Sequence, residues 1–310
     1  MGITIVALES PQVAALRALV DDPDLESEFG EWRIPGALED WMRGSFRFRD
    51  GTRMACLDGE PAGFCLPFVL RGARESWAWL TLGVAGRFRR RGLGSALLEA
   101  VTDRLVRAAH PLPLGEICFS TWSPNPAGAA FAAHHGFAHV RRSWRMERPR
   151  GPIPVPVWPD GMTVRVFDES PEAIRDWNAA YNDSFAEHYH YVATTEDHYR
   201  EIMDDSDYRR EGILLAYRTG ACVGFARNWI NAERGELATL GVVAAARGVG
   251  LGRALLRASV AWQEGAGAPS VTLGVDGENE GAIRLYRSEG FVVARTRDAW
   301  SRRVVGMPPA

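Results

Sequence analysis

Two short segments have the composition of an anion-binding loop. They are Arg89-Arg90-Arg91-Gly92-Leu93-Gly94 and Arg247-Gly248-Val249-Gly250-Leu251-Gly252. Glycine adopts positive φ readily and lets another molecule approach the backbone closely. Where such a segment joins a strand to a helix, successive N–H groups converge on an anion and the positive end of the helix adds to the attraction. Both segments predict a pyrophosphate site, and a glycine-rich turn without a ligand is the alternative.

Two other phosphate-binding motifs are excluded by the residues present. A Walker A loop needs a lysine, and all 36 basic residues of this chain are arginine. A dinucleotide fingerprint needs glycine or alanine at its sixth position, which is Leu97 counted from Gly92 and Leu255 counted from Gly250. The two loops therefore belong to another class of phosphate site.

The loops lie within an internal repeat. Residues 81–98 and 239–256 are identical at eleven of eighteen positions without a gap. A length of 310 residues also fits two domains of roughly 150 residues each. Between the copies, residues 149–161 contain five prolines, which forbid a helix and favour an extended, semi-rigid spacer. The sequence predicts domains at 1–148 and 162–310, joined by a linker at 149–161.

Each half shows the periodicity of an α/β domain with a mixed sheet flanked by helices. In the second half the apolar patterns predict helices and strands in alternation, with a hairpin turn at Thr219-Gly220. The expected strands are 162–167, 212–218, 221–230, 236–243, 270–275 and the segment from 291 to about 305, and the expected helices are 171–184, 195–203, 250–264 and 279–289.

These motifs resemble those of the GNAT acetyltransferase superfamily. The pattern R-x-x-G-x-G follows a strand ending in L-G-V in both copies, and the second copy adds N-x-x-A-x-x-L-Y-x-x-x-G-F from Asn279 to Phe291. The resemblance implies two tandem GNAT-like domains that take acetyl-CoA as acyl donor, with the loop on the CoA pyrophosphate and a bulged strand on the pantetheine arm. It assigns CoA binding to Leu240, Gly241, Val242, Arg247, Gly248, Val249, Gly250, Leu251, Gly252, Arg253 and Asn279, and in the first copy to Leu82, Gly83, Val84, Arg89, Arg90, Arg91, Gly92, Leu93 and Gly94.

The same resemblance assigns catalytic roles in the second copy. Acetyl transfer to an amine needs a base for the ammonium and a proton for the leaving thiolate. Glu236, on the strand before Leu240, is the expected base, and Tyr286 is the expected acid. An exposed strand carboxylate and a core aromatic are the alternative interpretations. The expected reaction is direct attack in a ternary complex, because no cysteine stands at a motif position.

The first copy lacks both groups. Ala78 stands opposite Glu236 and Ala132 opposite Tyr286, while Asn125 opens only a partial match to the second motif. The glycine loop is intact. We therefore expect the first domain to be catalytically silent, and either to bind CoA structurally or to serve as scaffold.

The acceptor is less well defined by the sequence. The layout is similar to that of the mycothiol synthases, but His190 and Trp229 stand where that group is described as having an acid and a lysine. Residues 168–208 contain twelve Asp or Glu and two Arg, which suits a small cationic primary amine or, alternatively, solvated helix faces. His188 and His190 are expected to line the acceptor site. Acetylation of a cysteinyl sugar and a non-catalytic acyl-CoA-binding module are the alternative functions.

Composition bears on the expected partners, metal content and location of the protein. A net charge of −3 gives no attraction to nucleic acid or anionic lipid, and no apolar run reaches the roughly 18 residues of a membrane span. The four cysteines are scattered and the histidines lack ligand spacing, so we expect no metal. Without a signal-peptide pattern the expected location is cytoplasmic. The sequence does not indicate an oligomeric state.

Overall fold

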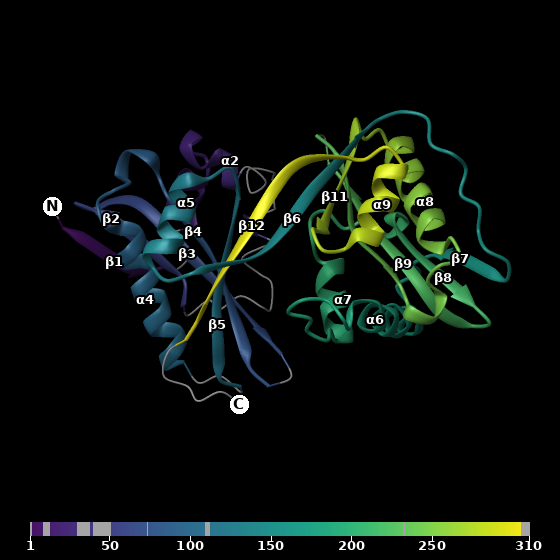
Figure 1. The fold of residues 1–310 in the computed structure, drawn as a ribbon, viewed down its shortest axis with the longest axis horizontal. Coiled ribbons are helices and arrows are strands. Elements are labelled where there is room, and N and C mark those ends of the chain that lie inside the picture. The colour runs from purple at the N-terminus through teal and green to yellow at the C-terminus, as the bar shows by residue number, and fades with distance from the viewer. Residues whose placement is uncertain are drawn as a thin grey trace. The chain divides into compact units, whose positions relative to one another are not determined.

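The chain forms two compact units. The computed structural model describes residues 2–8, 13–29, 38–39, 51–72, 74–108, 112–231 and 233–304. The first unit comprises Met1–Arg141 and Arg297–Ala310, and the second comprises Arg142–Thr296. Each is a mixed sheet with helices packed on it, as the repeat predicts (Figure 1).

The first unit places its glycine loop between a central strand and a helix. The pair β4 and β5 is parallel, and the pairs from β1 to β4 are antiparallel. Its strands lie in the order β1 (Ile3–Ala7), β2 (Arg53–Leu57), β3 (Glu60–Arg71), β4 (Ser76–Val84), β5 (Leu114–Ser123) and β12 (Val292–Arg303). Its helices are α1 (Val13–Val20), α2 (Glu26–Phe29), α4 (Leu93–Arg107) and α5 (Pro126–His134).

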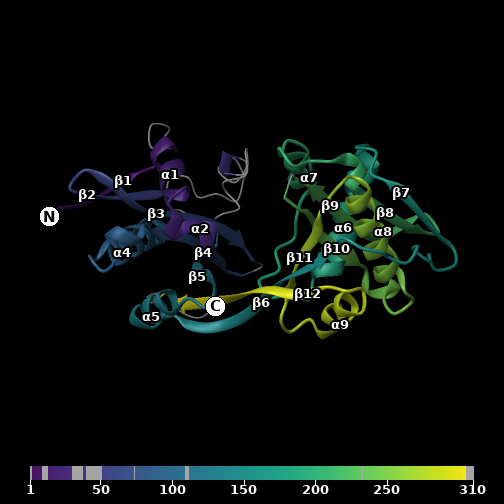
Figure 2. The same ribbon diagram turned by 90° about the horizontal axis from the view of Figure 1, so that it is seen from above.

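The second unit repeats this plan. The parallel pair is β10 with β11, and β6 pairs antiparallel with β11. Its strands lie in the order β6 (Ala138–Pro149), β11 (Ser270–Asp276), β10 (Gly235–Val242), β9 (Ala221–Ile230), β8 (Ile213–Arg218) and β7 (Met162–Val166). Its helices are α6 (Pro171–Phe185), α7 (Glu196–Met203), α8 (Leu251–Gly265) and α9 (Glu280–Ser288) (Figure 2). Every helix and strand expected in this half is confirmed.

The sheet of the second unit is buried on both faces. The apolar sides of α8 and α9 form one core with β10 and β11, and those of α6 and α7 form another with Phe225. Two glycines of β10 mark the faces. A Cβ on Gly235 would lie 2.0 Å from Gln263 of α8, and one on Gly241 would lie 2.4 Å from the Phe225 ring and 3.0 Å from Ser184 of α6. Side chains of β10 thus face either α8 or α6. Because these glycines are six positions apart yet face opposite sides, the alternation shifts by one residue between Leu237 and Thr239.

The compact units do not coincide with the predicted domains. Each unit is completed by strand residues of the other repeat, since the second begins at Arg142, within β6, and the first resumes at Arg297, within β12. Two arginines dock these strands in the same way. Arg148 donates from Nε to the Glu289 carbonyl at 3.0 Å, and Arg302 donates to the His135 carbonyl at 2.8 Å. Both acceptors are the C-cap residues of a helix, α9 and α5.

The proline-rich segment packs on the second unit and is not a free spacer. No helix or strand is assigned between Arg150 and Gly161, in agreement with its prolines. Ile153 and Trp158 nevertheless pack against the core shared by α8 and α9. Arg148 also donates to the carbonyls of Gly151 at 3.1 Å and Pro152 at 2.7 Å. These contacts fix the direction in which the chain leaves β6.

A buried carboxylate joins α8 to α9, and its removal should destabilise the second unit. The Glu289 side chain is 2% exposed and is paired with Arg253 and with Arg257, whose Nε lies 2.8 Å away. Breaking a buried pair from one side costs about 3–5 kcal/mol. We expect Glu289→Ala to lower the free energy of unfolding of the second unit by about that amount in urea titrations at pH 7.

The loss should depend on pH in a defined direction. Burial raises the pKa of Glu289, but hydrogen bonds from Arg257 and Arg253 outweigh it and hold the pKa below its ordinary value. The stabilisation is therefore complete above the ordinary carboxyl pKa of about 4.3 and is lost as pH falls through the lower, folded value. Glu280→Ala, at an 81% exposed position in α9, is the control and should change stability little. Equal losses in both variants would contradict the assignment.

Candidate active site

Strand β10 is irregular where the pantetheine arm is expected. Its pairing with β9 shifts by one residue between Leu237 and Thr239, so Ala238 forms a β-bulge. On its other edge the parallel pairing with β11 ends at Leu237, although β10 continues to Val242. Within the described residues, β10 and β11 therefore separate beyond Leu237. Main-chain N–H and C=O groups on that edge are left for a ligand to satisfy.

Strand β4 of the first unit separates from its neighbour but is not bulged. Its parallel pairing with β5 ends at Leu80, while the strand continues to Val84. Its antiparallel pairing with β3 keeps one register from Ser76 to Val84. Among the residues that the structure describes, the bulge in the central strand thus distinguishes the second unit from the first.

Both glycine loops open a helix with left-handed backbone. Gly248 and Gly250 have φ of 80° and 94°, and Gly250 is the N-cap of α8. The first unit has the same backbone at Arg90 (φ 62°) and Gly92 (φ 84°). A left-handed conformation costs an L-residue about 1–2 kcal/mol, so glycine is the favourable residue here for its backbone. N–H groups in the first turn of each helix lack intrahelical acceptors and suit an anion.

The motif arginine acts through its side chain on the protein itself. Arg247 donates from Nε to the Val242 carbonyl at 3.2 Å and from a terminal nitrogen to the Ser184 carbonyl at 3.0 Å. Arg89 makes the equivalent bonds, to the carbonyls of Val84 and Asp24, both at 3.0 Å. The shared arginine therefore ties the end of the central strand to the preceding helical segment. The sequence pattern assigned it to CoA and gave no sign of this role.

Several other residues assigned to CoA also have structural contacts. Leu93 and Leu251 are each 1% exposed, so only their main chain is open to a ligand. Arg253 is paired with Glu289, and Asn279 caps α9 by accepting from the Ala282 N–H at 3.1 Å. Partly buried Leu82 and Val84 pack on the core of the first unit, and Leu240 and Val242 on that of the second. Val249 is 50% exposed.

Tyr286 lies on the α8 face of the sheet. It is on the inner side of α9, is 7% exposed, and packs against Phe291 with ring centroids 6.0 Å apart. In the described part of the chain its hydroxyl has no hydrogen-bond partner. Burial raises the pKa of Tyr286 to about 12, so the phenol keeps its proton at neutral pH. It is thus both a core aromatic and an available proton donor.

Glu236 lies on the opposite, α6 face of β10. It pairs with Trp229 on β9 and with Thr272 on β11, before the bulge. Its Oε2 lies 3.7 Å from a guanidinium nitrogen of Arg145 and 3.7 Å from one of Arg234. Two guanidinium groups favour the ionised carboxylate. The side chain is 20% exposed, so it is neither fully buried nor simply solvated.

His188 and His190 lie in the turn after α6. His188 packs edge-on against Phe185 with centroids 4.6 Å apart, and the His190 ring stacks on Tyr189 at 3.9 Å. Asn182 fixes this segment from α6, because its Oδ1 accepts from the Tyr191 hydroxyl and the Thr194 N–H, both at 2.9 Å. The sequence did not indicate this anchor.

Many of the carboxylates in residues 168–208 have local partners. Asp183 accepts from the Ala244 N–H at 2.8 Å, which fixes the start of the glycine loop. Asp205 and Asp207 lie 3.3 and 3.4 Å from Arg227. Others are engaged in the same way: Asp168 with Ser170, Glu169 with Tyr208, Glu187 with Arg247, and Glu196 and Asp197 with Arg200. These contacts weaken the interpretation of the segment as a surface that attracts cations.

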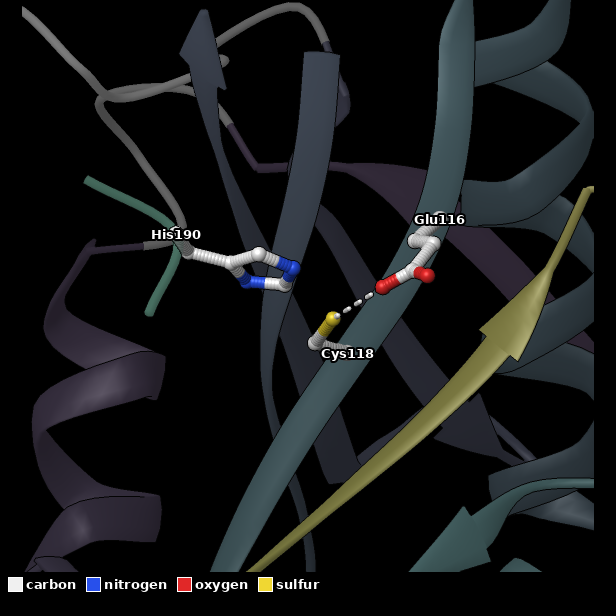
Figure 3. A group of neighbouring side chains, drawn as sticks. All are labelled: Glu116, Cys118 and His190. Atoms are coloured by element: carbon white, nitrogen blue, oxygen red, sulfur yellow. Dashed lines mark hydrogen bonds between the residues drawn. The ribbon is translucent and has the colours of Figure 1, made fainter. Parts of the chain in front are cut away.

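The first unit has a polar cluster where β12 meets β5. Figure 3 shows Cys118 and Glu116 on β5, with the thiol donating to Glu116 Oε2 at 4.0 Å. The Ser301 hydroxyl donates to the same oxygen at 2.9 Å, and Arg303 lies 3.5 Å from Glu116. Burial raises the pKa of Cys118 to about 12, so this thiol is a poor nucleophile at neutral pH. His190, also drawn there, is a residue of the second unit.

Comparison with known sequences identifies one family twice. The sequence model of the Acetyltransferase (GNAT) family matches residues 14–137 and 172–291. A mycothiol acetyltransferase from Thermobispora bispora is 34% identical over 212 residues, covering 66% of this chain and 69% of that protein. No helix in the described ranges is long and apolar enough to cross a membrane.

Solved structures show the same tandem fold. A GNAT protein from Sphaerobacter thermophilus matches with a TM-score of 0.73 and 23% identity, over 97% of this chain and 95% of that one. A tandem GNAT protein from the clavulanic acid biosynthesis pathway matches with a TM-score of 0.74 and 17% identity, over 99% and 100%. With both repeats recognised by sequence and the tandem arrangement found in solved structures, the chain belongs to the GNAT acetyltransferase family.

Proposed function

We propose that the chain transfers an acetyl group from acetyl-CoA to the primary amine of a small molecule, with the chemistry in the second unit. The observation that carries this is the bulge at Ala238 together with the separation of β10 from β11 beyond Leu237. The bulge redirects main-chain groups of the strand, and the separation frees them on the side where a pantetheine arm can pair. The first unit has the separation without the bulge.

The residues present fit a CoA thioester in extended form. The main chain from Thr239 to Val242 holds the pantetheine and polarises the thioester carbonyl. N–H groups at the start of α8 hold the pyrophosphate, and Gly248 and Gly250 give them the required backbone. Arg247 supports this loop from behind through the carbonyls of Val242 and Ser184.

Two side chains move the protons. Glu236 accepts a proton from the acceptor ammonium, directly or through water, and so frees the nitrogen lone pair to attack the acetyl carbonyl. The C–N bond forms as the C–S bond breaks, and the nitrogen then releases its second proton to water, which leaves a neutral amide. Tyr286 donates its proton to the departing sulfur, and its raised pKa keeps that proton in place at neutral pH. Glu236 and Tyr286 lie on opposite faces of the sheet, which suits groups acting on the incoming amine and the outgoing thiolate.

The first unit serves as scaffold in this proposal. It has Ala78 where the second has Glu236 and Ala132 where the second has Tyr286, and both alanines are fully buried. Its glycine loop keeps the backbone conformation of the second, but Arg90 replaces Gly248 at one of the two left-handed positions. We propose that this unit has no catalytic centre.

A cysteinyl sugar is the second candidate for the acceptor. The relative that supports it is named a mycothiol acetyltransferase and is 34% identical. A cationic amine is favoured only by the acidic segment, many of whose carboxylates already have local partners. Salt tests whether the acidic segment attracts the acceptor, because attraction of a cation to acidic residues is screened within roughly 10 Å at 0.1 M salt. A kcat/KM that falls steeply with added salt favours the cationic amine.

Calorimetric titration with acetyl-CoA tests the proposal. We expect one site per chain with micromolar affinity. Gly250→Val should weaken binding at least about 10-fold, because a β-branched residue at φ 94° strains the loop by more than 1.4 kcal/mol. Gly92→Val is the matched control and should leave binding unchanged.

Gly92 and Gly250 have similar surroundings, so the control is a close match. A Cβ on Gly250 meets nothing within 4 Å, and one on Gly92 meets only Ile3, at 3.7 Å. Both substitutions therefore act through backbone strain and should cost similar stability. Loss of binding with Gly92→Val alone would move the donor site to the first unit, and absence of binding to CoA-free protein would overturn the proposal.

A further inference from the structure

Arg145 is a residue of the first repeat that lies within the second unit. It is on β6, paired with Gly274 of β11. Its guanidinium is 3.7 Å from Glu236 Oε2, and Arg234, from the turn before β10, is 3.7 Å from the same oxygen. Both arginine side chains are 17% exposed and Glu236 is 20% exposed, so solvent screens these pairs only in part.

Among the described residues, the first unit has no counterpart of the ion pair between Arg145 and Glu236. The equivalent bonds of Arg148 and Arg302 to helix C-cap carbonyls align β6 with β12. In that alignment Arg148 corresponds to Arg302, so Arg145, three residues earlier, corresponds to Ala299. The repeated glycine loops place Ala78 opposite Glu236. Both members of the ion pair are thus alanine in the first unit.

Docking of the strand does not account for this difference. The Arg148-type contact docks the exchanged strand in both units, and the first unit holds its strand with Ala299 in place of Arg145. A partly shielded ion pair also contributes little net stability. What the second unit has in addition is a carboxylate to which a catalytic role is assigned.

We propose that Arg145 is a positioning residue for Glu236. Its guanidinium fixes the carboxylate on the α6 face of β10 and favours the ionised form, which takes the proton from the acceptor amine. The inference rests on the proposed function, because it needs Glu236 to act as base. The first repeat then supplies a residue to the active site of the second, although its own unit has no catalytic centre.

Other charged groups near this face have neighbours of their own. Thr272 of β11 pairs with Glu236 of β10 on one side and with Glu147 of β6 on the other. Arg234 lies over the Trp229 ring with 5.7 Å between the guanidinium carbon and the centroid. Arg227 is engaged by Asp205 and Asp207. On α7, burial and then Arg227 lower the pKa of His198, so it is neutral at pH 7.

Steady-state kinetics against pH test the inference. Arg145→Gln should lower kcat about 10- to 100-fold, since loss of orientation has effects of this size. The acid limb of kcat should move to higher pH, because without a neighbouring cation the carboxylate ionises less readily. Affinity for acetyl-CoA and the unfolding midpoint should stay as in the wild type. Arg150→Ala, at an exposed arginine of the same segment, is the control.

A double-mutant cycle separates positioning from a structural role. In a Glu236→Gln background, Arg145→Gln should cost no further activity, because the proposed effect of Arg145 on catalysis requires that carboxylate. An equal loss in both backgrounds would overturn the inference. The inference would also be overturned if Arg145→Gln kept the wild-type kcat and pH profile while Glu236→Gln was inactive. That result would leave the proposed function intact. Full activity in Glu236→Gln itself would overturn the inference and the assignment of Glu236 as base, but not acetyl transfer by the chain, which the acetyl-CoA titration tests.

A conservative variant gives an independent measure. Arg145→Lys keeps the charge but lacks the planar fork. We expect it to restore the acid limb to its wild-type position with an intermediate kcat. If Arg145→Gln is not obtained folded, this variant decides the question, since a kcat equal to wild type together with unchanged KM would show that the forked contact does not position Glu236.

Discussion

Tyr286→Phe is expected to lower kcat about 100- to 10,000-fold, the range found when a general acid is removed. The side chain is 7% exposed and its ring packs on Phe291, so phenylalanine preserves the packing. Among the described residues no protein group bonds to the hydroxyl, and its loss therefore leaves no buried partner unsatisfied. Initial-rate assays of acetyl transfer should show the lower kcat. Calorimetric titration should show an unchanged dissociation constant for acetyl-CoA.

The deficit should be constant with pH. Burial raises the pKa of Tyr286 to about 12, so the hydroxyl stays protonated throughout pH 6 to 10 and its ionisation cannot shape the profile there. Tyr217→Phe, on strand β8 between β9 and β7, is the control, because burial also raises the pKa of that tyrosine but it lies on the α6 side. Full activity in Tyr286→Phe, or equal losses in both variants, would exclude Tyr286 as the acid.

The sequence predicted the fold of each repeat closely because its signals are local. Strand alternation, helical periodicity and the glycine loops depend on near neighbours in the chain, and the helices and strands expected in the second half are those observed. The exchange of β6 and β12 was missed for the same reason. The sequence of β6 has the same alternation whether it closes its own sheet or that of the other unit, and only contacts such as Arg148 to Glu289 reveal the choice.

The site was predicted in part. The motif placed Gly248 and Gly250 at the positions where the backbone is left-handed. The resemblance placed a bulge in the preceding strand around Leu240 to Val242, and the structure has it at Ala238. Contacts between distant segments could not be read from one sequence. Arg145 precedes Glu236 by 91 positions. Asp183 precedes Ala244, whose N–H donates to its carboxylate, by 61 positions. The acidic segment was left as either a surface that attracts cations or solvated helix faces, and partners such as Arg227 for Asp205 and Asp207 are distant in the chain.

Glu236→Gln should lower kcat about 100- to 10,000-fold, because the amide cannot accept the ammonium proton. The substitution is nearly isosteric and keeps a hydrogen-bond acceptor near Arg145 and Arg234. The unfolding midpoint should therefore change little. Glu233→Gln, at an exposed position in the turn before β10, is the matched control and should retain wild-type kcat. The measurement is initial rate at saturating acetyl-CoA from pH 6 to 10.

The pH dependence of this variant distinguishes a base from a structural carboxylate. An alkyl ammonium has a pKa of about 10.4, so the free amine becomes more abundant as pH rises toward that value. Where Glu236 acts as base, the deficit of Glu236→Gln should shrink with rising pH, because solvent then removes the proton that the carboxylate otherwise takes. The deficit of Tyr286→Phe should not shrink, since the departing sulfur still lacks its donor. A Glu236→Gln deficit that is the same at pH 6 and pH 10 would mean that this carboxylate only holds Arg145 and Arg234 in place.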